Sequence, residues 1–216
     1  MLKKVILAAL LVSSAVFAQL PFHIGGRAAV NYGTAYGSDA DYANGAAGFN
    51  VGVAAKITAL PLITIVSGME IDLRRINFKE NYTDDYSNFS DDNMLSIWYL
   101  NVPVVARYNI IPLIYVDAGL AFGFNVSSNL HVEEIESNER HGVVDIVKED
   151  VDYSKLTKSL DVGFIVGAGV SVLPSMLDVD FRLVVGLNSF MDQNDEGLDA
   201  TIKHVRMQLG VTYWFL

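Results

Sequence analysis

After position 18 the chain alternates between two kinds of residue, and this alternation commits it to β-strands. Within 114–127 every even-numbered position is apolar, while the odd-numbered positions are mostly glycine or polar. A period of two keeps each kind on its own face of a strand, whereas a helical period of 3.6 mixes them within two turns. Seven further stretches share the pattern, which predicts eight strands at 22–33, 48–60, 62–77, 95–109, 112–127, 159–173, 176–189 and 201–215.

The connections between these predicted strands alternate between short and long. Tight turns are expected at Pro61, at Ile111–Pro112 and at Pro174–Ser175, whereas the connections at 34–47, 78–94, 128–158 and 190–200 are long and polar. Short periplasmic turns and longer external loops are typical of outer-membrane barrels. The sequence therefore predicts an all-β fold: an eight-stranded antiparallel up-and-down transmembrane β-barrel with short periplasmic turns, long extracellular loops and both termini in the periplasm.

The N-terminal segment has the form of a secretory signal peptide. Lys3 and Lys4 precede an apolar run at 5–12, and Ala18 is the small residue before the expected cleavage site. As a helix, the run is too short to cross about 30 Å of hydrocarbon. We therefore expect a signal peptide at 1–18 and a barrel domain at 19–216, exported to the cell outer membrane.

Composition excludes several other classes of protein. The chain is 51% hydrophobic, yet after the signal peptide no stretch approaches the roughly 20 consecutive apolar residues of a transmembrane helix. Membrane segments in this chain must therefore be strands. The chain has no cysteine, which removes disulfides, thiol catalysis, cysteine-ligated metals and lipoprotein acylation.

The choice of residues on the two faces indicates which one meets lipid. Small residues recur on the polar face, and they suit the lumen of an eight-stranded barrel, which is just wide enough to be filled by side chains. Charges are nearly absent from the apolar face, apart from Arg75 close to the outer rim. Aromatic residues gather near the predicted strand ends, as membrane interfaces favour: Phe22, Tyr108, Tyr213 and Phe215 at the periplasmic side, and Tyr32, Phe49, Trp98 and Phe124 at the exterior.

The charges assigned to the inward face balance. Charges inside a narrow lumen must be paired or hydrogen bonded, so this balance predicts a filled, salt-bridged lumen rather than a selective channel. The net charge of −10 then resides in the loops, and so acidic a surface makes nucleic acid an implausible partner. The predicted lumen network comprises Arg27, Lys56, Arg74, Arg107, Arg182 and Arg206 with Glu70, Asp72, Asp117, Asp161, Asp178 and Asp180.

Two of the long loops combine carboxylates with other functional groups. The loop segment 81–92 mixes acidic and aromatic residues, which suit either Ca²⁺ or a protein partner. It lacks the D-x-[DN]-x-[DN]-G spacing of a calcium loop, so we expect a solvated acidic loop and neither a metal site nor a cofactor. The loop 128–158 is similar, and its strands are expected to extend beyond the membrane.

Catalytic combinations are scarce, because the chain has only four histidines. His131 and His141 lie in the longest predicted loop, and His23 lies near one strand end. His204 near Ser189 or Asp199 is the one conceivable nucleophile–base arrangement, but no local spacing supports it. The sequence therefore predicts a protein that is not an enzyme.

The last predicted strand resembles the C-terminal signal that the outer-membrane barrel assembly machinery recognises. The resemblance rests on the spacing of a polar residue, a glycine and two aromatic residues, and Leu216 after the final aromatic departs from it. It implies the assembly machinery as a partner during biogenesis. The matching residues are Gln208, Gly210, Tyr213 and Phe215.

The segment 98–108 is similar to the tyrosine-leucine-x-x-proline strand of the PorT-like outer-membrane β-barrel family. Tyr99, Leu100 and Pro103 carry this resemblance, and Pro103 is otherwise unusual inside a strand because it cannot donate to the ladder. The resemblance implies an eight-stranded barrel of the OmpA and OmpX type of architecture. Some family members are linked to protein secretion, and no functional residue carries over.

These observations favour a non-enzymatic integral outer-membrane protein that serves envelope structure or binds a partner through its acidic extracellular loops. Outer-membrane lipid surrounds it, and an envelope or secretion protein is the expected kind of partner. Three alternatives remain open: an accessory component of a protein secretion system, a narrow channel and a lipid-modifying enzyme.

Overall fold

The computed structural model describes residues 22–38, 40, 43–60, 62–84, 87–138, 143–154, 156–174, 176–191 and 202–215. The predicted signal peptide at 1–18 lies outside these ranges. Within them, no helix is long and apolar enough to cross a membrane.

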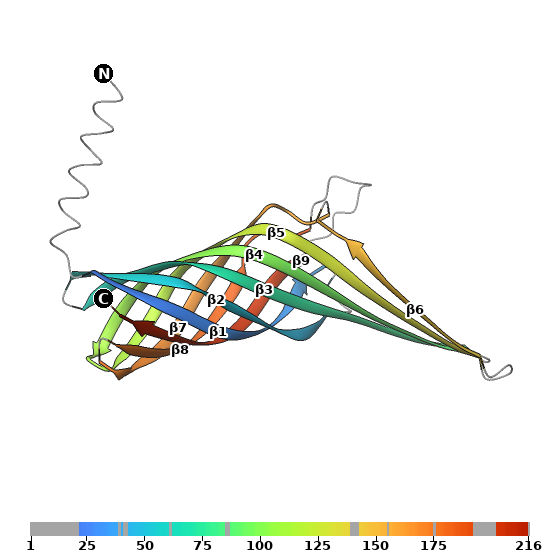
Figure 1. Ribbon diagram of the computed structural model, residues 1–216, viewed down its shortest axis with the longest axis horizontal. Helices are drawn as coiled ribbons and strands as arrows, with labels where there is room; N and C mark the ends of the chain where they lie inside the picture. Colours follow the sequence, from blue (N-terminus) through green and yellow to red (C-terminus); the bar gives the residue numbers. More distant parts are fainter. Residues whose placement is uncertain are drawn as a thin grey trace, which may run out of the picture.

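The described chain forms strands joined into one antiparallel sheet that closes on itself (Figure 1). Each strand pairs with the next along the chain, except that β6 does not pair with β7. β5 pairs with both β6 and β7, and β9 returns to pair with β1. The predicted eight-stranded up-and-down barrel is therefore confirmed, with β6 as an additional strand outside the closed ring. The strands are β1 (Phe22–Gly37), β2 (Ala43–Leu60), β3 (Ile63–Asp84), β4 (Ser87–Ile111), β5 (Ile114–Asn138), β6 (Val143–Asp152), β7 (Leu160–Leu173), β8 (Leu177–Gly186) and β9 (Ile202–Trp214).

The two ends of the barrel differ. At the short-turn end, tight connections join β2 to β3, β4 to β5 and β7 to β8. At the opposite, projecting end, β3, β4, β5 and β6 continue well past the other strands (Figure 1). β1 begins and β9 ends at the short-turn end, as an even number of antiparallel barrel strands requires.

The projecting strands extend much further than the sequence boundaries indicate. The segment 78–94 is expected as a loop, but β3 and β4 stay paired up to Asp84 and Ser87. Within 128–158 the strands are expected to extend, and β6 pairs with 129–138 of β5. We call this part, residues 79–84, 87–94, 130–138 and 143–152, the projecting sheet. The alternation fades there because polar residues occupy both faces, so no apolar face marks the strands.

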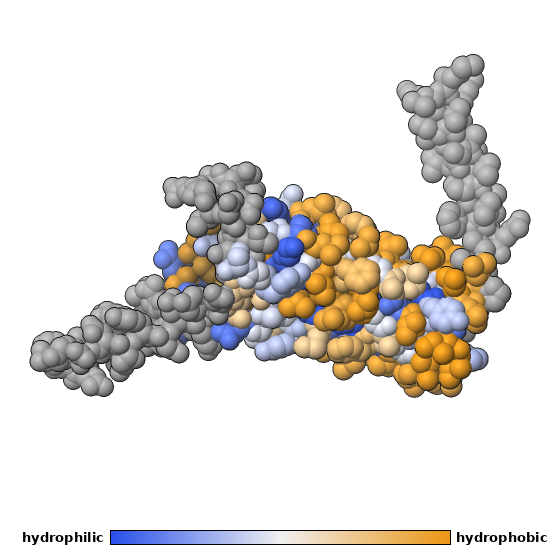
Figure 2. Space-filling view, turned by 180° about the vertical axis from the view of Figure 1, so that it is seen from behind, coloured by the Kyte–Doolittle hydropathy of each residue, from blue (hydrophilic) through white to orange (hydrophobic). Residues whose placement is uncertain are grey.

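The inside and outside of the barrel invert the pattern of a soluble protein. Large apolar side chains are exposed outside, with Val30 at 62%, Val53 at 57% and Leu209 at 55% exposure, while the charged side chains of Arg27 and Asp180 are buried inside. Figure 2 shows hydrophobic residues gathered over the barrel wall and more hydrophilic ones toward the projecting end. Such a surface is stable only when hydrocarbon surrounds it.

Glycines on the inward face make room for the large side chains of the lumen. A Cβ atom at Gly169 would lie 2.6 Å from Cε2 of Tyr115, and one at Gly123 would lie 2.9 Å from Nη2 of Arg74. These contacts are closer than side-chain packing tolerates. The small residues of the polar face therefore match the lumen rather than an aqueous surface.

Pro103 lies in the middle of β4 and interrupts its ladder with β3. Ser67 pairs with Val104 and Glu70 pairs with Asn101 in one unbroken register, but the two positions between them form no bridge. Proline has no backbone N–H to donate, which accounts for the gap.

A β-bulge in β5 reverses the two faces of that strand beyond Val126. Tyr99 pairs with Asn125, whereas the preceding Trp98 pairs with Ser127, so Val126 is the extra residue. Ser128 is consequently buried, with 0% exposure, and Ser127 joins the outer face. The alternation over 114–127 groups Ser127 with the polar positions that are predicted to face the lumen, and for Ser127 this prediction is wrong.

Candidate functional site

Ion pairs fill the lumen near the short-turn end. Arg107 of β4 donates from Nε to Asp117 Oδ1 at 2.9 Å and from Nη1 to Asp178 Oδ2 at 2.7 Å. Arg182 of β8 donates from Nη2 to Asp117 Oδ2 at 3.1 Å. Asp117 therefore joins two arginines from different strands, while the Arg107 guanidinium also lies 3.5 Å above the centroid of the Tyr115 ring.

The same network continues across the lumen to β1 and β3. Arg182 Nε lies 3.2 Å from Asp180 Oδ1, and Asp180 in turn accepts from Arg27 Nη2 at 2.9 Å. Arg27 Nε lies 3.2 Å from Glu70 Oε1, and Asn50 donates to the other oxygen of Glu70 at 2.5 Å. Charges of opposite sign thus alternate from wall to wall. We call this group the short-turn cluster: Arg27, Glu70, Arg107, Asp117, Asp178, Asp180 and Arg182.

A second group, the projecting-end cluster, consists of Asp72, Arg74, Asp161 and Arg206. Asp72 accepts from Arg74 Nε at 2.9 Å and also pairs with Arg206. Arg74 crosses the lumen from β3 to pair with Asp161 of β7, and it lies 4.0 Å from the centroid of the Tyr99 ring. Two arginines and two carboxylates therefore neutralise one another here.

Lys56, the twelfth residue of the predicted network, occupies a different position. It is half-buried, and its Nζ lies 4.3 Å from the centroid of the Trp214 ring. Trp214 Nε1 donates to Asp178 Oδ2 at 2.8 Å, which places Lys56 beside the short-turn cluster. That cluster holds four carboxylates and three arginines, so Lys56 supplies the fourth positive charge. Among the described side chains, none forms an ion pair with it.

The packed interior lies between the two open ends of the barrel, and the two ends differ. At the short-turn end, a hollow of about 500 Å³ is lined by His23, Lys56, Arg107 and Asp178, among others. At the projecting end, Phe190 is fully buried and stacks on the ring of His204, with 4.0 Å between centroids. An apolar cluster therefore covers the ion pairs at that end: Ala35, Ile76, Leu95, Ile97, Tyr99, Phe190 and Ile202.

This packing leads to a prediction about conductance. We expect no stepwise ion currents when the refolded chain is inserted into planar lipid bilayers, because ion-paired side chains leave no continuous water-filled path through an eight-stranded lumen. Folded and heat-unfolded samples, compared at equal protein concentration, separate channel activity from leakage. Reproducible unitary currents from the folded sample alone would contradict a closed lumen.

The conceivable catalytic set does not assemble in the described part of the chain. Ser189 Oγ contacts Met191 O and Ile202 N, each at 3.4 Å, and no hydrogen bond joins it to His204. Asp199 and His141 lie outside the described residues. His131 bonds to Asp150 instead, and no group of three His, Cys, Asp or Glu side chains in the described ranges is placed to hold a metal ion.

The residues of the predicted assembly signal divide between the two faces of β9. Gln208 is buried in the lumen, and Gly210 lies directly beneath the Arg27 guanidinium. Tyr213 and Phe215 are exposed on the outer face, with 6.3 Å between their ring centroids. The aromatic pair is therefore accessible from outside the barrel, and recognition by the assembly machinery stays a prediction.

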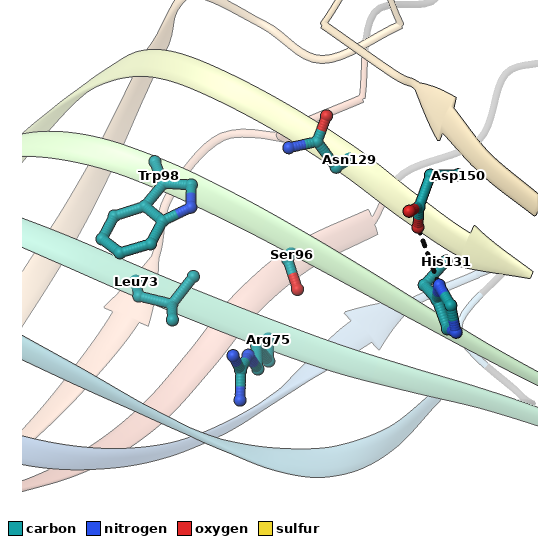
Figure 3. A pocket seen from close by; sticks show the side chains of 7 residues that line it. All are labelled: Leu73, Arg75, Ser96, Trp98, Asn129, His131 and Asp150. Atoms are coloured by element: carbon teal, nitrogen blue, oxygen red, sulfur yellow. Dashed lines mark hydrogen bonds and ion pairs between the residues drawn. The ribbon is translucent and has the colours of Figure 1, made fainter.

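A polar hollow on the outer face is the feature that the sequence did not reveal (Figure 3). Its volume is about 420 Å³, and it lies where β3, β4 and β5 leave the barrel and β6 pairs beside β5. The unusual outward charge of Arg75 is visible in the sequence. The bulge at Val126, which is not, turns Asn129 and His131 of β5 to the same outer face. The lining residues are Leu73, Arg75, Ser96, Trp98, Asn129, His131 and Asp150.

The comparison with family models identifies the class of fold. The family model described as outer membrane protein beta-barrel domain matches residues 17–192. No curated protein sequence matches the chain.

Three solved structures illustrate the similarity. The chain is 10% identical to Ail, the attachment invasion locus protein of Yersinia pestis, over 89% of this chain and 98% of that one, with a TM-score of 0.43. It is 14% identical to CarO2 of Acinetobacter baumannii, over 91% and 100% of the two chains, with a TM-score of 0.44. For Neisserial surface protein A the identity is 12%, the coverage 90% and 97%, and the TM-score 0.42.

Proposed function

Because this chain belongs to the family of outer membrane protein beta-barrel domains, we propose that it is a non-enzymatic anchor that holds the projecting sheet outside the cell for a protein partner. The short-turn end then faces the periplasm, together with both termini. Outer-membrane barrels keep their short turns on that side and their long connections outside.

The projecting sheet is the observation that carries this proposal. The closed lumen offers no route for a solute, so the part of the molecule available for interaction is the sheet beyond the barrel. In the described chain, β6 pairs with β5 alone, which leaves its other edge unpaired. Unpaired edges accept an added strand from a partner.

The charge of the projecting sheet indicates the chemistry of that partner. Its sequence contains two lysines, Lys79 and Lys148, against eleven carboxylates. A surface so dominated by one sign attracts the opposite charge and accelerates encounter. A basic protein surface is therefore the expected complement. The carboxylates are Glu80, Asp84, Asp91, Asp92, Glu133, Glu134, Glu136, Asp145, Glu149, Asp150 and Asp152.

A trimmed variant tests the proposal. The pairs Phe78↔Asn93 and Asn129↔Asp152 lie directly opposite each other, so each can be closed by an Asn-Gly turn that removes the sheet beyond it. We expect a partner cross-linked to the full-length chain in native envelopes to be lost with the trimmed chain, and to be weakened by added salt.

Three results would point to other functions. If the same partner cross-links to both the full-length and the trimmed chain, the partner binds the barrel and not the projecting sheet. A secretion defect on deletion, restored only by the full-length chain, would favour the PorT-like accessory function, which the resemblance of segment 98–108 suggests. Envelope leakage restored by the trimmed chain would instead favour a purely structural function.

A further inference from the structure

The outer-face hollow lies at the edge of the apolar band. On β4 the lipid-facing side chains run from Tyr108 to Trp98, which are ten residues apart. At about 3.3 Å per residue and a tilt of about 40°, they span about 25 Å, the height of the apolar band of outer-membrane barrels. Arg75 pairs across the sheet with Ser96, two residues beyond Trp98, so it stands at the level of lipid headgroups.

The floor of the hollow is apolar and its sides are polar. Leu73 faces outward but is only 2% exposed, and Trp98 beside it packs edge-on against Phe49, with 5.9 Å between centroids. Ser96 and Arg75 lie next to them on the side of the projecting end, and Asn129 stands on the neighbouring β5 (Figure 3). A molecule with an apolar body and a polar head fits this order from the bilayer outward.

Within the part of the chain that the structure describes, Arg75 is a cation of the hollow that has no carboxylate partner. His131 Nδ1 lies 2.7 Å from Asp150 Oδ1. Two residues further along the same β5–β6 pair, Lys148 Nζ lies 2.9 Å from Glu133 Oε1. Among the described side chains, no carboxylate lies within ion-pair distance of Arg75, which is exposed. The Asp150 side chain is 79% exposed, so water and salt screen its repulsion of an anion.

We propose that this hollow binds the phosphate of an outer-leaflet lipid headgroup, with Arg75 as its anchor. The guanidinium fork matches phosphate oxygens in geometry, and Ser96 and Asn129 add neutral hydrogen-bond donors. Trp98 and Leu73 contact the apolar part of the same lipid. The inference rests on the proposed orientation, with the projecting end outward, and it is independent of any partner of the projecting sheet.

The chain itself provides a matched control for Arg75. Lys203 lies on the outer face of β9, near the projecting end and opposite β4 in the ring of strands. Arg75→Gln and Lys203→Gln each remove one positive charge from the same rim, but only the first alters the hollow. Heat-modifiable gel mobility verifies that both variants fold.

The experiment measures retention of a phosphorylated outer-membrane glycolipid by native mass spectrometry of the full chain in detergent micelles. We expect Arg75→Gln to lower retention about fivefold, the effect of one basic residue at a membrane surface, and Lys203→Gln to change it less than about twofold. The enzymatically dephosphorylated glycolipid should bind all three proteins equally.

Two outcomes would overturn the inference. Equal losses from the two variants would mean that general rim charge, and not the hollow, retains the lipid. Displacement of the glycolipid by millimolar inorganic phosphate would mean that the site takes free phosphate rather than a headgroup. If Arg75→Gln still cross-links to the partner of the projecting sheet as the unmodified chain does, the proposed function stands and either result counts against lipid binding at the hollow alone.

Discussion

Asp117→Asn is expected to lower the free energy of unfolding of the barrel by about 3 to 5 kcal/mol, the usual cost of removing one partner from a buried ion pair. Asp117 bonds to both Arg107 and Arg182, which are 5% and 3% exposed. Asparagine keeps the shape but supplies no negative charge, so two guanidinium groups that are largely shielded from water lose stabilisation.

The measurement is equilibrium unfolding in urea with the protein in phospholipid vesicles, followed by tryptophan fluorescence. Asp150→Asn is the matched control, because Asp150 also contacts a basic side chain, His131, but is itself 79% exposed. Exposed pairs contribute about 0 to 1 kcal/mol. Equal and small losses in the two variants would mean that water reaches the Asp117 site and that the lumen is not filled.

The inward position of these charges was predictable, whereas their pairing was not. Alternation assigns Arg74 and Asp161 to the lumen because a period of two fixes the face of every residue in a regular strand. It does not reveal that Arg74 pairs with Asp161, since β3 and β7 are not neighbours in the barrel and meet only across its interior. Pairing across a lumen depends on strand register and tilt, and neither can be read from the residues of one strand alone.

The outer-face hollow was hidden for a related reason. A single extra residue, Val126, reverses the faces of β5, so the simple period assigns His131 and Asn129 to the wrong side. Extension of the strands within 128–158 was expected, but the strand pairing within 78–94 and the bounds of β6 were not, because alternation reports a contrast between two environments. Where water surrounds both faces of a strand, as along β6, neither face needs to be apolar, so the sequence shows no alternation.

Val53→Arg is expected to cost about 2 to 4 kcal/mol of unfolding free energy in a bilayer, because it places a charge near the middle of the lipid face. Val53 is 57% exposed, and its neighbour across the β2–β3 pair, Met69, is 53% exposed. Neither side chain has a polar partner to share the charge, so the guanidinium must reach an interface along the outer wall.

The same substitution near the rim separates membrane burial from simple loss of valine. Val126 is 67% exposed and lies beyond Phe124 toward the projecting end, so Val126→Arg is expected to cost about 0 to 1 kcal/mol. Urea titrations of both variants in vesicles of one lipid composition measure the difference. If the two costs were equal, depth in the bilayer would not matter, and water rather than hydrocarbon would surround the apolar wall. A larger cost at Val53 follows only if the exposed apolar band is the part of the barrel that the membrane encloses.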